Sequence, residues 1–200
     1  MSGLLAILTM GSLILALKQR APLSVYAYLL AELVYIPPVM LAAWLLGIWS
    51  PWYAAIYVLF TLPILLAILW IVHDVLLEVH ADAKPVAIAF ILAIIPGRMS
   101  YLEIHRPVTR FDWINLIFGV ALMWAGTLVG YAAKHIERWD LGLILAILWI
   151  LQAVSFFGWT IHLWEKWNFV IDPVLGIVAF SLLAWRTRDR DYSPTALVHR

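Results

Sequence analysis

The chain contains no cysteine, which excludes disulfide bonds, thiolate metal ligands and a cysteine nucleophile. Charged residues are also scarce. They form 12% of the chain, about half of the share of roughly 25% that is typical of soluble domains. The net charge is +1, so nothing in the charge balance indicates a nucleic acid as a partner.

Sequence motifs of several common chemistries are missing as well. There is no DDxxD-type motif for a magnesium–diphosphate site, no GxSxG motif, no glycine-rich phosphate loop and no cluster of histidine boxes. The last apolar stretch has no lysine in mid-span, which argues against a retinal Schiff base. We therefore expect neither a metal ion nor a cofactor.

Apolar residues are present in excess. They form 65% of the chain, against about 45–50% in soluble domains, and the mean hydropathy is +0.95. A helix needs about 17–25 apolar residues to cross a bilayer. Seven segments are candidates for such helices: Ser2–Leu17, Pro22–Leu46, Trp52–Leu77, Lys84–Pro96, Phe111–Ala133, Leu141–His162 and Trp167–Trp185. The fourth is expected to extend to about Glu103, with a kink or break at Pro96–Gly97.

These segments predict an all-α, polytopic membrane protein with one seven-helix domain over residues 1–186 and a polar tail over residues 187–200. If the N-terminus lies outside, nine Lys and Arg residues fall on the inner side and four on the outer side. Because cytoplasmic loops are enriched in these residues, we expect the N-terminus outside and the tail in the cytoplasm. The host membrane would be the plasma or inner membrane of a bacterium, or the endoplasmic reticulum of a eukaryote.

One acid, Glu32, lies inside the apolar run Ala21–Leu46. It is about ten residues from the inner end of its helix, or about 15 Å at 1.5 Å per residue, which places it near mid-membrane. Such a residue is a functional candidate because a charge is costly there. Desolvation disfavours the charged form, so we expect a neutral carboxylic acid that can donate a proton. Tyr28 and Tyr35 share its helix face. The alternative is a structural acid, hydrogen-bonded to a neighbouring helix.

A second acid, Asp172, precedes Pro173 in the last apolar segment. If that helix begins near Trp164, Asp172 lies about 12 Å below the outer surface, at a depth comparable to that of Glu32. The two acids could therefore face one cavity. The alternative is an acid at a helix end near the membrane surface.

The segment HDVLLEVHADAK at residues 73–84 contains the ionisable side chains of His73, Asp74, Glu78, His80 and Asp82. Metalloproteases of the zincin type carry two histidines four residues apart with a glutamate between them, and that spacing is absent here. We interpret the segment as a solvated helix end rather than a metal site.

The chain contains 12 tryptophans, and on the expected topology most of them fall in the outer half. Rings in a belt at the membrane surface should occur at both surfaces, so the excess indicates a pocket that opens outward. We expect this pocket to be lined by Trp44, Trp113, Trp159 and Trp164 together with His162. Aromatic faces attract cations, which would suit a carbocation. A belt combined with ordinary packing is the alternative.

Two short motifs resemble the small seven-span integral-membrane terpene cyclases of fungal meroterpenoid and indole-diterpene pathways and their bacterial relatives. The first is the basic turn LKQR at 17–20 followed by AELVY at 31–35, where the family often has Trp in place of Ala31. The second is VIDPVLGIVAF at 170–180, followed by the basic stretch WRTRDR.

This resemblance implies a class II cyclisation of a lipophilic prenylated or epoxidised isoprenoid, without metal. Glu32 would be the general acid that protonates a terminal epoxide or alkene, and Asp172 its partner or a second acid. Tyr28, Tyr35 and the aromatic residues named above would contact the substrate. Such an enzyme is an isomerase or lyase of terpenoid biosynthesis.

Two other functions fit the sequence. A small proton- or cation-coupled transporter would use Glu32 and Asp172 as ion sites, and a structural subunit of a membrane complex would pair them with partner helices. A closed aromatic pocket that holds both acids favours the cyclase. A polar path from side to side favours transport, and a lipid-facing Glu32 favours the subunit.

Overall fold

The computed structural model describes residues 3–18, 21–79, 83–104, 108–135, 139–161 and 165–188. These residues form helices and no strands. The α-helices are α1 (Gly3–Leu17), α2 (Leu23–Leu46), α3 (Pro51–Val79), α4 (Ala83–Leu102), α5 (Arg110–Ala132), α6 (Trp139–Thr160) and α7 (Glu165–Arg188), and a short 3₁₀ helix, η1 (Ala133–His135), follows α5.

Five of these helices, α2 to α6, are long and apolar enough to cross a membrane, and α1 is a shorter apolar helix. Large apolar side chains also cover the outside of the bundle, as Ile7, Leu66 and Ile91 illustrate with exposed fractions of 68%, 65% and 58%. A surface of this kind is stable against lipid and not against water. The protein is therefore a multi-pass membrane protein.

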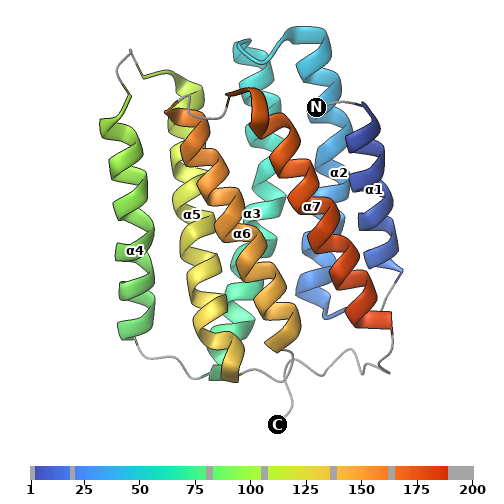
Figure 1. Ribbon diagram of the computed structural model, residues 1–200, viewed down its shortest axis with the longest axis vertical. Coiled ribbons are helices and arrows are strands. Elements are labelled where there is room, and N and C mark those ends of the chain that lie inside the picture. Colours follow the sequence, from blue (N-terminus) through green and yellow to red (C-terminus); the bar gives the residue numbers. More distant parts are fainter. Residues whose placement is uncertain are drawn as a thin grey trace.

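Six helices form a closed ring. Going round it, α1 packs against α2, α2 against α3, α3 against α5, α5 against α6, α6 against α7, and α7 against α1 (Figure 1). Helix α4 lies outside the ring, against α5 and α6. The N-terminal end of α1 and the C-terminal end of α7 lie at opposite ends of the bundle. The ring encloses an interior in which side chains from different helices meet.

The tightest contact in the ring is between α5 and α6, and glycine makes it possible. A Cβ atom at Gly126 would lie 2.9 Å from the backbone oxygen of Ala146 and 3.2 Å from the backbone nitrogen of Ile150. Gly119 makes room for the ring of Phe157 in the same way, since a Cβ there would lie 2.5 Å from the ring. Small residues at helix interfaces allow this close approach in membrane proteins.

The helix bounds agree with the apolar segments of the sequence within a few residues. Helix α4 extends to Leu102, close to the expected end at about Glu103, and of the expected kink or break at Pro96–Gly97 the break is absent. The helix of Glu32 likewise continues through Pro37 and Pro38. Helix α5 begins with a capping box, in which Asp112 accepts a hydrogen bond from the backbone N–H of Thr109 and Thr109 Oγ1 accepts one from that of Asp112.

Candidate active site

Glu32 from α2 and Asp172 from α7 face the same interior of the ring. Their carboxyl groups lie within electrostatic range of each other, although α2 and α7 are not neighbours in the ring. Ser155 of α6 is hydrogen-bonded to the Asp172 carboxyl group. The Oδ1 atom of Asp172 is shielded from the surroundings and accepts no hydrogen bond from any described residue. We call Glu32, Asp172 and Ser155 the acid layer.

Three buried rings form a layer on one side of the acids, which we call the Tyr28 layer. Tyr28 of α2 meets Trp149 of α6 edge to face, with ring centroids 5.6 Å apart and an interplanar angle of 81°. The ring of Phe180 of α7 lies 6.5 Å from that of Tyr28. Tyr28 and Trp149 are both 0% exposed. The Tyr28 hydroxyl lies beside the Glu32 carboxyl group and the Trp149 indole.

A larger group of rings lies on the other side of the acids, and we call it the Tyr57 layer. It consists of Tyr35, Tyr53, Tyr57, Phe111, Phe118, Phe156 and Trp159. Tyr57 is at its centre, with ring centroids 6.0 Å from Tyr35 and 5.7 Å from Phe111. The Tyr57 hydroxyl is hydrogen-bonded to Tyr35 and lies within electrostatic range of both acids.

The layers follow one another in the same order along α2 and α6, and in the reverse order along α7, which runs in the opposite direction (Figure 1). Along α2, Tyr28 comes first, Glu32 second and Tyr35 third. Along α6 the order is Trp149, Ser155 and then Phe156. The two acids therefore lie between two sets of aromatic rings, and the side chains of both residues are partly exposed. This arrangement offers aromatic faces to a positive charge.

Several expected site residues take part in this arrangement and others do not. Tyr28, Tyr35 and Trp159 belong to the two aromatic layers. Trp44 does not: it is 79% exposed near the end of α2. Trp113 is 50% exposed and stacks on Tyr101 of α4, with ring centroids 5.3 Å apart. Neither ring is part of the two aromatic layers beside the acids, and the expectation that both line a pocket that opens outward stays a prediction.

Two further expected residues, His162 and Trp164, lie outside the described residues. Within the described part of the chain, no three His, Asp or Glu side chains come together as a metal site would require. Of the segment expected to be a solvated helix end, His73 is exposed, with 67% of its side chain accessible.

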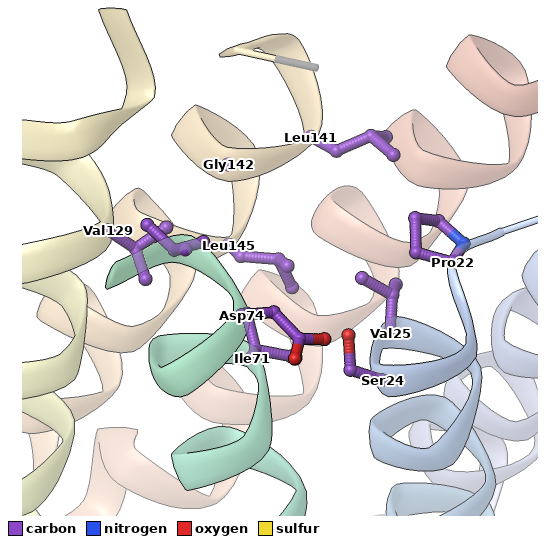
Figure 2. A pocket seen from close by; sticks show the side chains of 10 residues that line it. Pro22, Ser24, Val25, Ile71, Asp74, Val129, Leu141, Gly142 and Leu145 are labelled. Atoms are coloured by element: carbon purple, nitrogen blue, oxygen red, sulfur yellow. The ribbon is translucent and has the colours of Figure 1, made fainter. Parts of the chain in front are cut away.

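Asp74 differs from that expectation. Its side chain is only 19% exposed, with Oδ1 3.7 Å from Nδ1 of His73. It lines a pocket together with Ser24, Ile71, Val129 and Leu145 (Figure 2). The carboxyl group of Asp74 and the hydroxyl of Ser24 point toward one another in this pocket, so Asp74 faces the interior although its neighbour His73 is exposed. We call this the Asp74 pocket.

Sequence reasoning missed four residues of the acid layer and the two aromatic layers. Tyr53 and Tyr57 are four residues apart on α3, a spacing that places both on one helix face. Ser155 and Trp149 give no comparable signal, because a single serine or tryptophan in an apolar helix is common. Ser155 matters because it orients Asp172, and Trp149 because it completes the Tyr28 layer.

No family model matches the chain, and no curated protein or solved structure is significantly similar to it. Chemically, the acid layer can donate and accept a proton, and the rings on either side of it can stabilise a cation.

Proposed function

We propose that this protein is a membrane-embedded terpene cyclase that starts the reaction by protonating a lipophilic isoprenoid, either a prenyl chain or its terminal epoxide. One observation carries the proposal. Glu32 and Asp172, which come from opposite ends of the sequence, lie within electrostatic range of each other between two aromatic layers.

In this function Glu32 is the general acid. A carboxyl group in an apolar enclosure favours its neutral form, and a neutral acid can give its proton to an alkene or epoxide. The cation that results is stabilised by the faces of nearby rings such as Tyr28 and Tyr57. Asp172, held by the hydrogen bond from Ser155, is the group that positions the acid or removes the final proton. The net reaction is an isomerisation.

The topology that we propose has seven spans, with the N-terminus outside and the C-terminus in the cytoplasm. The alternating directions of successive helices support it, as do the N-terminal end of α1 and the C-terminal end of α7, which lie at opposite ends of the bundle (Figure 1). The excess of Lys and Arg on the proposed inner side supports the orientation.

The direct test is product formation by the purified protein in lipid nanodiscs. Linear isoprenoids of increasing length are supplied, with and without a terminal epoxide, and products are separated by chromatography and weighed by mass spectrometry. The expected product has the mass of the substrate and fewer double bonds. Glu32→Gln should abolish it and leave the fold intact, whereas Glu103→Gln, the same change at an exposed acid, should have no effect. Near-normal product from Glu32→Gln would remove Glu32 as the acid.

Proton- or cation-coupled transport is a second candidate, favoured by a separate observation. Polar side chains follow the ring interior from the Asp74 pocket through Tyr28 and Glu32 to Tyr57. The test is proton flux into vesicles that contain the protein and a pH-sensitive dye. Flux that depends on Glu32, together with no cyclised product from any isoprenoid tested, would replace the cyclase by the transporter.

A further inference from the structure

We propose that Glu32 exchanges protons with one end of the bundle through a relay that consists of Asp74, Ser24 and Tyr28. The relay would return a proton to Glu32 after each turnover, and its use in catalysis rests on the proposed function. A cyclase needs such a supply because the acid loses its proton at the start of the reaction, whereas the last proton leaves the substrate at a different carbon.

The outer part of the relay is the Asp74 pocket. It is partly open to the surroundings, and its enclosed part is large enough for a water molecule. The Asp74 carboxyl group enters the pocket from α3 and the Ser24 hydroxyl from α2 (Figure 2). Ser24 is 1% exposed, and its hydroxyl makes no hydrogen bond to any described residue. It is therefore available to pass on a proton.

The inner part of the relay is Tyr28, which connects the pocket with the acid layer. Ser24, Tyr28 and Glu32 follow one another at intervals of four residues and so lie on one face of α2. Long side chains on a helix lean toward its N-terminus, so Glu32 leans toward Tyr28 and Tyr28 leans toward Ser24. In this conformation the Tyr28 hydroxyl lies beside the Glu32 carboxyl group without the full geometry of a hydrogen bond.

Within the Tyr28 layer, the Tyr28 hydroxyl is the group through which a proton can pass. The other two rings, Trp149 and Phe180, are buried at 0% and 2% exposure and fill the interior beside Tyr28. Phe180 has no exchangeable proton on its side chain, and the indole of Trp149 donates but does not accept. Only the phenol hydroxyl can both accept and donate, so only Tyr28 can carry a proton through this layer.

The step conserves protons at each carrier. Tyr28 gives its hydroxyl proton to the Glu32 carboxylate while its oxygen takes one from Ser24 or from a water in the pocket. Ser24 takes one in turn from Asp74 or from water. Each hydroxyl thus ends with the proton count it had at the start, Glu32 gains one proton, and the pocket side loses one. The other titratable groups that face Glu32 are Asp172, Tyr35 and Tyr57, and they lie away from the pocket.

The test follows the exchange of the Glu32 proton for deuterium and needs no substrate. The protein in lipid nanodiscs is transferred rapidly into D₂O, and the carbonyl stretch of the protonated carboxyl group is followed by infrared spectroscopy. The band is assigned by its loss in Glu32→Gln. The variants Tyr28→Phe and Ser24→Ala remove one hydroxyl each, and Asp74→Asn removes the outer carboxyl. Ser12→Ala is the matched control, since Ser12 is also a buried serine in an apolar helix.

We expect Tyr28→Phe and Ser24→Ala to slow the exchange on the order of 100-fold, the usual effect of removing a positioned proton carrier. Asp74→Asn should slow it by a smaller factor, because water can enter the pocket without the carboxyl group. Ser12→Ala should leave it unchanged, and amide exchange, recorded in the same spectra, should be equal in all variants.

Three results would overturn the relay. The first is unchanged exchange in Tyr28→Phe. The second is slow exchange in Tyr57→Phe with normal exchange in Ser24→Ala, which would show that protons reach Glu32 from the Tyr57 side of the bundle. The third is the absence of any protonated Glu32 band. These results differ from failure of the proposed function, which is the absence of a cyclised product whatever the exchange rate.

Discussion

The ring of Tyr28 on α2 meets the ring of Trp149 on α6 edge to face, at a centroid distance of 5.6 Å. These two helices are not neighbours in the ring of six, so the contact crosses its interior. In the Tyr28 layer, contacts between aromatic side chains across the ring interior therefore add to the contacts between adjacent helices. The same contact separates the Asp74 pocket from the acids.

This contact makes Trp149 important for stability. Trp149→Ala removes a side chain that is 0% exposed and leaves a cavity in the interior, which should lower the free energy of unfolding by about 3–5 kcal/mol. The control is Trp139→Ala on the same helix, where the ring is 55% exposed and the cost should be small. Thermal unfolding in nanodiscs measures both, and equal losses would show that Trp149 does not brace the interior.

The close packing of α5 and α6 makes a second prediction. Gly126→Ala would force a methyl group against backbone atoms of Ala146 and Ile150, and overpacking of this kind should cost about 1–3 kcal/mol. At Gly130 a Cβ would lie 3.4 Å from the Ala146 Cβ, an ordinary contact. Gly130→Ala should therefore be neutral or stabilising, because alanine favours a helix by about 1 kcal/mol. Thermal unfolding distinguishes the two variants, and equal stability would contradict the prediction.

The third prediction concerns Asp172. Asp172→Asn keeps the size of the side chain and a partner for Ser155, but it removes the negative charge and the ability to take up a proton. Under the proposed function, turnover should fall by about 10²–10⁴-fold, while unfolding temperature changes little. Ser155→Ala should give a smaller loss, because Asp172 would remain but would be less well oriented. A rate near that of the unchanged protein in Asp172→Asn would restrict this acid to a structural role.

The fourth prediction tests the proposed topology and uses the absence of native cysteine. Helices α5 and α1 begin at one end of the bundle, and α4 begins at the other (Figure 1). Single cysteines are placed at Arg110 and Lys84, which are both exposed near these helix starts. A membrane-impermeant maleimide should label Arg110→Cys in intact cells and Lys84→Cys only after permeabilisation. The reverse pattern would invert the orientation.

The positions of the helices could be predicted from the sequence because long apolar runs and short polar turns alternate along it. Helix α7 illustrates this, with its start at Glu165 against an expected start at Trp167. Which side of each helix faces the ring interior and which faces lipid could not be predicted. Lipid and the ring interior are both apolar, so a helix such as α2 is hydrophobic on all sides and no periodic pattern marks the inner face.

This explains which site residues were found. Glu32 and Asp172 are visible because an acid in an apolar run is rare, and Tyr28 and Tyr35 because they share a helix face with Glu32. Trp44 and Trp113 are exposed and lie outside the aromatic layers, which the sequence could not indicate because tryptophan is also common at the membrane surface. Asp74 could not be recognised as an interior residue, because the side chains that enclose it come from α2, α5 and α6.

The position of α4 outside the ring has a consequence for how short such a chain can be. Helices α3 and α5 are in contact and run in the same direction (Figure 1). The chain must therefore return to the other end of the bundle between them, and α4 is the segment that does so. A deletion of α4 would not leave a smaller version of the same protein. Without α4, α5 would run in the opposite direction, and the glycines of α5 could no longer pack against α6 in the same way. Helix α4 is thus required by the connectivity of the chain, even though it is not part of the ring of six helices.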